Sequence, residues 1–141
     1  SMEADDENNW KVYVKEAELY YKLSEEIKIA HPLISYYMNL HGLEKVHKNS
    51  TKIPPGKKGE SIKKKVMKYI KKKTSTLEEI KPTLDISNKT EAIEIYEDYL
   101  NSALAKVDKM EKDPNTTIDL RIAKDFMTVA ILIETMETLN C

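Results

Sequence analysis

Apolar residues recur at three- and four-residue spacing along most of the chain, which is the period of an amphipathic helix. This pattern predicts helices over residues 6–30, 32–48, 60–73 and 88–112, followed by a last helix whose apolar residues run from Ile118 to Leu139. A short helical turn at 77–81 is expected in the connector between the third and fourth of these helices. The sequence therefore predicts an all-α protein with five helices, or six if the short turn is counted.

The second predicted helix is expected to organise the rest. Pro32 has its φ fixed near the helical value and lacks an N–H, so it suits the first position of a helix. Two apolar arcs on this helix predict two packing neighbours, and Gly42 is expected where another backbone comes close. Asn88 and Glu91 have the spacing of a helix N-cap and its partner. The first arc contains Leu33, Tyr36, Tyr37, Leu40 and Leu43, and the second contains Ile34 and Met38.

A chain of 141 residues is one domain, or two small subdomains that share a core. Its single cysteine, Cys141, excludes a disulfide framework and a cysteine-based metal site, and favours a reducing compartment. No apolar run reaches the roughly 18 residues of a membrane span. The sequence predicts a cytoplasmic protein.

Charge is distributed unevenly along the chain. Between Lys45 and Lys73 there are 12 lysines and one acidic residue, Glu60, although the whole chain carries a net charge of −1. Such a segment attracts anionic membrane, RNA or acidic protein segments, or it is simply a solvated helix face. The densest part of this basic patch is expected to be Lys63, Lys64, Lys65, Lys68 and Lys72.

Candidate catalytic chemistry is sparse. The three histidines, His31, His41 and His47, lack metal-ligand spacing, and neither a phosphate-binding glycine loop nor a nucleophile elbow is present. We therefore expect no enzyme activity, no cofactor, no metal and no small-molecule substrate.

With no catalysis expected, the residues favour a function in binding a helix of a partner protein. A groove between the second and third predicted helices can accept another helix through apolar anchors flanked by charges. The residues expected to line it are Met67, Ile70, Lys71, Ile34, Met38 and Lys45. Alternatively, Ile34 and Met38 contact the second half of the protein.

Three stretches are similar to a known family. The run HPLISYYMNLHGLEKVHK at 31–48 resembles the DPxxxYYxxLYAxxxG pattern of the Vta-one (LIP-five) family of ESCRT cofactors. In the same order, EDYLNSAL at 97–104 resembles that family's ENYAL, and DFMTVAILIETM at 125–136 resembles its SFYxASLLIDVI. Most of these are apolar positions of a helical bundle, but three motifs in register make the resemblance persuasive.

The resemblance implies a fold and a function. The fold would be two MIT-like three-helix bundles of about six to seven helices in all, over residues 1–75 and 76–141, packed as one compact unit. The function would be a non-catalytic adaptor, peripherally associated with endosomal membrane, that binds C-terminal helices of ESCRT-III subunits and helps to recruit or activate the Vps-four AAA ATPase in multivesicular body sorting. KVMKYI at 65–70 matches the family's KLMxxL, which places Met67 in the partner groove.

The chain also departs from the family pattern. His31 replaces the acidic residue that usually precedes the proline, so a good N-cap is missing. The family's C-terminal ATPase-binding segment has no counterpart before Cys141, so we expect a fragment that does not stimulate the ATPase alone.

Overall fold

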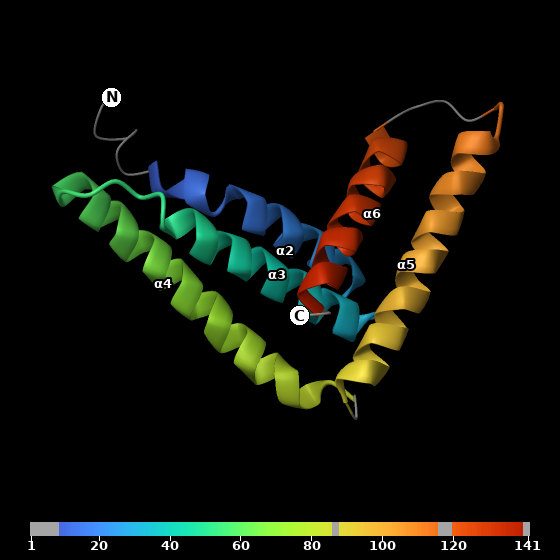
Figure 1. The fold of residues 1–141 in the computed structure, drawn as a ribbon, viewed down its shortest axis with the longest axis horizontal. Coiled ribbons are helices and arrows are strands. Elements are labelled where there is room, and N and C mark those ends of the chain that lie inside the picture. The colour runs from blue at the N-terminus through green and yellow to red at the C-terminus, as the bar shows by residue number, and fades with distance from the viewer. Residues whose placement is uncertain (1–8, 86–87, 116–119, 140–141) are drawn as a thin grey trace. The chain divides into compact units, whose positions relative to one another are not determined.

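The computed structural model describes residues 9–85, 88–115 and 120–139, and Figure 1 shows their helices. This part of the chain contains α-helices and short 3-10 helices but no strand, which confirms the all-α prediction. The elements are η1 (Asn9–Tyr13), α2 (Lys15–Ile27), α3 (Pro32–Ser50), α4 (Lys57–Ile80), η2 (Lys81–Thr83), α5 (Lys89–Lys112) and α6 (Leu120–Leu139).

The chain forms two compact units, Ser1–Leu84 and Asp85–Cys141. The predicted boundary after residue 75 falls inside α4, which continues without a break to Ile80. The prediction that this helix ends at residue 73 is wrong because Leu77 is buried and extends the apolar stripe of Ile70 by two further turns. Residues 77–80 therefore belong to unit 1, and the described part of unit 2 contains the two helices α5 and α6.

The first predicted helix is divided. Residues 6–8 lie outside the described part of the chain, η1 covers Asn9–Tyr13, and α2 begins only at Lys15. The 3-10 segment places the Trp10 ring 6.4 Å from that of Tyr69 on α4, measured between centroids. α2 ends at Ile27, three residues earlier than predicted, and a turn leads to His31. Its backbone, with φ of −136° and ψ of 66°, avoids the helical region, which is disfavoured before a proline.

α3 confirms two predictions about its own sequence. Pro32 occupies its first turn, and His31 makes no side-chain cap. Gly42 lies where α2 approaches closely, because a β-carbon there would come within 3.2 Å of the Tyr20 side chain and 3.4 Å of the Ala17 α-carbon. A larger side chain at this position would push the two helices apart.

The core of unit 1 lies between α3 and its two neighbours. α3 packs against α2 on one side and α4 on the other, while η1 packs against α4. The buried residues of this core are Val14, Ala17, Tyr36, Leu43, Val46, Ile62, Val66, Ile70 and Leu77.

The loop before α4 is shorter than predicted. Gly56 has φ of +103°, which favours glycine, and α4 begins at Lys57 instead of residue 60. Gly59 lies in the first helical turn, where a β-carbon would collide with the Pro54 carbonyl oxygen at 1.6 Å. The glycine that suggested a loop is thus a packing requirement of the helix.

In unit 2, α5 packs against α6. The predicted N-cap is confirmed, because the Glu91 backbone N–H donates to Asn88 Oδ1 at 2.9 Å. Tyr96 on α5 and Thr135 on α6 are fully buried, and Lys106 lies 3.7 Å from Asp125 across the pair. That this hairpin forms an MIT-like bundle, and that the two halves pack as one unit, stay predictions.

Replacing Gly42 with leucine should lower the free energy of unfolding by about 1–3 kcal/mol, because the side chain has no space beside Tyr20 and Ala17. Urea titration followed by circular dichroism measures the effect. The control is His47→Leu, on an exposed position of the same helix. Equal stability of the two variants would show that the close approach at Gly42 is unimportant.

Removing the cap with Asn88→Ala should destabilise α5 by about 0.5–2 kcal/mol, since the Glu91 N–H loses its acceptor. Asn101→Ala, at an exposed position within α5, is the matched control. The same urea titrations compare them, and an unchanged midpoint for Asn88→Ala would contradict this role of the cap.

Candidate functional site

A groove with a volume of about 480 Å³ runs over the surface of unit 1 and is lined by α2, α3, α4 and the turn after α2. Its floor is one face of α3. Along that face, lining residues recur every three or four positions, with Ser35 and Tyr36 adjacent, as one side of a helix requires. They are Pro32, Ser35, Tyr36, Asn39 and Leu43.

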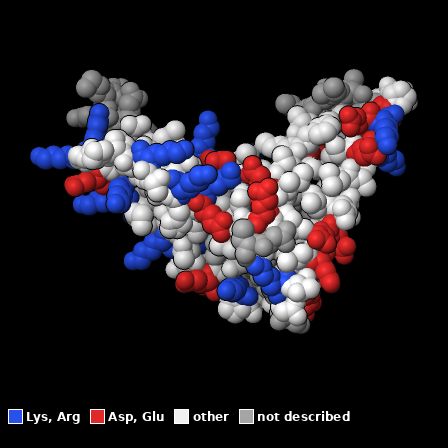
Figure 2. Space-filling model, in the orientation of Figure 1, with Lys and Arg blue, Asp and Glu red and all other residues white. Residues whose placement is uncertain are grey.

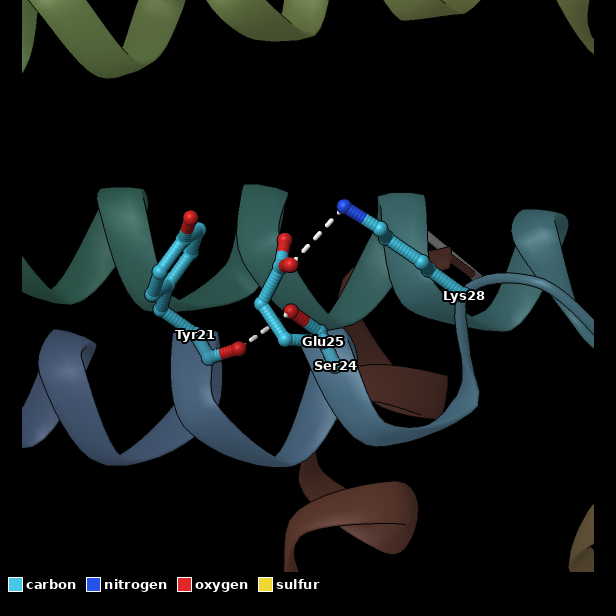
Figure 3. Close-up of polar contacts among 4 residues, drawn as sticks. All are labelled: Tyr21, Ser24, Glu25 and Lys28. Carbon is cyan, nitrogen blue, oxygen red and sulfur yellow. Dashed lines mark hydrogen bonds and ion pairs between the residues drawn. The ribbon is translucent and has the colours of Figure 1, made fainter.

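The α2 wall carries Tyr21 and Glu25, and Lys28 follows directly after the helix. Figure 3 shows these three side chains extending from α2 toward α4. Glu25 binds Lys28 at 2.8 Å, and the resulting hydrogen bond raises the pKa of Lys28. Ser24 beneath them is buried, and its hydroxyl donates to the Tyr21 carbonyl at 2.7 Å. The two charged side chains of this wall, Glu25 and Lys28, are therefore paired with each other.

The α4 wall consists of Tyr69, Lys73, Thr76, Leu77 and Ile80. All five lie on the stripe of α4 that continues past residue 73, where the sequence pattern was interpreted as the end of the helix. Ile29, at the open end near the turn, is 94% exposed although it is strongly apolar. A single exposed isoleucine is common, but with Ile80 it belongs to a concave apolar lining, which is typical of a binding site.

Two side-chain contacts connect α2 to α4 at one end of the groove. The Tyr69 hydroxyl donates to Glu18 Oε1 at 2.5 Å, and Lys73 Nζ lies 3.3 Å from the centroid of the Tyr21 ring. Burial, and then the bond to Glu18, raise the pKa of Tyr69 well above its usual value. Burial lowers the pKa of Lys73, against the opposing effect of Glu18 and Glu25.

The structure does not assemble the six residues that the sequence predicts for a groove. Ile34 and Met38 are 1% and 0% exposed, and Ile70 belongs to the core of unit 1. Lys45 turns toward α2, where it binds Glu16 at 3.1 Å and lies 5.8 Å from the centroid of the Tyr20 ring. Three of these four side chains are buried and the fourth is bound to Glu16, so they do not form an open groove with Met67 and Lys71.

Met67 and Lys71 are exposed on α4, and Met67 is 45% exposed. Met67 precedes Thr76 by nine residues, so at 3.6 residues per turn the two lie about 180° apart around the helix. The groove therefore opens on the flank of α4 opposite Met67. A role for Met67 in binding stays a prediction.

The basic patch covers the outer face of α4. Lys63, Lys64, Lys68 and Lys72 are exposed, and Lys65 is half-buried. Figure 2 shows basic side chains gathered toward the end of unit 1 where α4 begins. Among the described residues of α4 up to residue 77, Glu60 is the one acidic side chain.

The sequence does contain a signal for the α4 wall of the groove. Ile70, Lys73, Leu77 and Ile80 follow one another at helical spacing, which indicates that α4 continues past residue 73. The α2 wall had no comparable signal, because Tyr21 fits a core position as well as a groove position.

In the described ranges, no three His, Cys, Asp or Glu side chains form a group that could hold a metal ion. None of the helices described is both long enough and apolar enough to span a bilayer.

Comparison with known proteins gives one match. The family model described as "Vta1 like" matches residues 17–140. No curated protein matches the chain, and no solved structure matches it. The match covers all the helices that line the groove except the first two residues of α2, and it extends through unit 2. The chain therefore belongs to the Vta1-like family, whose members are non-catalytic cofactors of the Vps-four ATPase in the ESCRT pathway.

Proposed function

We propose that this chain is an adaptor that binds C-terminal helical tails of ESCRT-III subunits at the endosomal membrane and brings them to the Vps-four ATPase. The observation that carries the proposal is the open, largely apolar groove of unit 1 between α2 and α4. Family membership supports it, since a Vps-four cofactor acts where the ATPase meets its ESCRT-III substrates.

The dimensions of the groove suit a short helix. Along α4, the wall from Tyr69 to Ile80 spans about 16 Å at 1.5 Å per residue, which is about three helical turns. An amphipathic helix of that length presents two or three apolar anchors to one side. Tyr36, Leu43 and Leu77 form an apolar base that is already largely buried in the core, and the more exposed Ile80 and Ile29 provide surface for the anchors.

Binding of this kind would be weak. Each buried leucine contributes about 1.5–3 kcal/mol, and the costs of association and ordering remove much of the total. A micromolar dissociation constant of about 1–100 μM follows. Many copies of the partner in one filament would raise the effective affinity through avidity.

Placing an arginine in the groove should weaken tail binding. Thr76 is exposed and lines the groove, so Thr76→Arg blocks it without disturbing the core, whereas Ser75→Arg changes an exposed neighbour outside the groove. Calorimetric titration with C-terminal ESCRT-III tail peptides should show at least about tenfold weaker binding for Thr76→Arg alone, a loss of about 1.4 kcal/mol.

Met67→Asp tests the other flank of α4. On the groove proposal, this variant binds the tails as well as the parent protein does. Loss of binding in Met67→Asp with normal binding in Thr76→Arg would instead place the tail on the opposite flank. If the parent protein bound none of the tail peptides, the adaptor function itself would be wrong.

A second function is favoured by the outer lysines of α4. Lys64, Lys68 and Lys71 are exposed on the helix face that points away from the core. A row of lysines attracts an anionic membrane, at about 1 kcal/mol for each side chain near the surface. The chain would then bind membrane peripherally as well as ESCRT-III.

Sedimentation with vesicles that contain phosphatidylserine tests this second function. The triple change of Lys64, Lys68 and Lys71 to glutamine should weaken binding about 100-fold at low salt, and raised salt should weaken binding of the parent protein steeply. The control changes the exposed Glu78 and Glu79 to glutamine on the same helix. The absence of vesicle binding by the parent protein at low salt would exclude a membrane role for this face.

A further inference from the structure

Lys73 differs from the other lysines of α4 in its surroundings. Its ammonium lies 3.3 Å from the centroid of the Tyr21 ring and 5.5 Å from that of Tyr69, so two aromatic rings face it from two helices. The side chain is half-buried in the wall of the groove, whereas Lys71 and Lys72 beside it in sequence are exposed. Lys73 is therefore a cation placed inside a largely apolar site.

The nearest carboxylates bind other groups. Glu18 accepts the hydrogen bond of the Tyr69 hydroxyl, and Glu25 forms an ion pair with Lys28. Within the described ranges, no carboxylate forms an ion pair with Lys73. The ammonium lies over the faces of two rings, and the Lys73 side chain is part of the groove lining.

A helix bound in the groove would change the solvation of the Lys73 ammonium. An apolar helix seated over Lys73 would remove its remaining water and leave the ammonium only the two ring faces and the through-space attraction of Glu18 and Glu25, which is unfavourable. A helix with a carboxylate at this point would form a charge-assisted hydrogen bond in a site of low polarity, where such bonds are strong. The groove thus discriminates between helices by a single charge.

We propose that Lys73 is a specificity-determining residue that selects amphipathic helices with an acidic side chain placed among their apolar anchors. This inference rests on the proposed function and names the chemistry of the tail that the groove accepts. Lys28 at the rim does not provide the same selection, because Glu25 already neutralises it.

The alternative is a structural role, in which Lys73 only holds Tyr21 and Tyr69 together. A structural role predicts that loss of the charge weakens all ligands equally. A specificity role predicts that the loss matters only for acidic ligands. Pairs of peptides that differ only in charge distinguish the two.

The test titrates ESCRT-III tail peptides, each paired with a copy in which every Asp and Glu is replaced by Asn and Gln, into the full chain. The parent protein should prefer the acidic peptide by about 10- to 100-fold, the ratio expected for one hydrogen bond to a charged group. Lys73→Met should lose this preference, Lys73→Arg should keep most of it, and the control Lys72→Met, at an exposed position, should keep all of it.

The outcomes separate the two proposals. If the parent protein bound both peptides of a pair equally, Lys73 would not select acidic helices, while the adaptor function would stand. Equal weakening of both peptides by Lys73→Met would establish the structural role and overturn the inference. If Lys73→Met failed to fold, Lys73→Gln would remove the charge in its place, and an unchanged preference for the acidic peptide in that variant would overturn the inference. If no tail bound the parent protein, the proposed function would fail and this inference with it.

Discussion

The close contact between α2 and α3 at Gly42 is the constraint on which unit 1 depends. With no side chain at this position, α3 comes against Tyr20 and Ala17, so α2 lies directly on one side of it. The other side is left for α4, which packs through Val66, Ile70 and Leu77. α3 thus packs against two neighbouring helices, because its apolar residues face in two directions. Gly42 allows α2 to come close on one of these faces.

This arrangement explains why a groove forms. α2 and α4 both pack on α3, and the contacts of Glu18 with Tyr69 and of Tyr21 with Lys73 bring their side chains together near one end. Toward the other end, Leu77, Ile80 and Ile29 line open space above α3. Leu77 is already buried in the core, but Ile80 is half-buried and Ile29 is exposed, so a partner helix would bury more of these two. The groove is thus an apolar surface on three helices, α2, α3 and α4, against which a fourth helix from a partner could pack.

Sequence patterns predicted the elements well where a local signal was strong. Pro32, Gly42 and Asn88 each have one dominant physical role, and the structure confirms all three. Prediction failed where tertiary packing decided. Gly59 suggested a loop, but it lies in a helical turn against Pro54. The lysines at 71–73 suggested the end of the third predicted helix, but the helix continues because Leu77 beyond them is buried.

The groove was harder to predict than the fold for the same reason. Ile34, Met38 and Ile70 have the apolar character of anchors, and periodicity cannot tell an anchor from a core residue. Only the packing shows that all three are buried, and that Lys45 turns to Glu16. The residues that do line the groove, such as Tyr21 and Thr76, have no distinctive spacing, because their role comes from the separation of two helices distant in sequence.

The lysines of α4 show how one residue type acquires two roles from its position around a helix. Lys73 follows the buried Val66 by two turns, so it lies on the core side, while Lys64 and Lys68 lie on the opposite side in water. Exposed charges act at long range, are screened by salt and change mainly the rate of association. An enclosed charge acts only after docking and changes mainly the rate of dissociation. On the proposals made above, the outer lysines would bring an acidic partner to α4, and Lys73 would determine how long it stays.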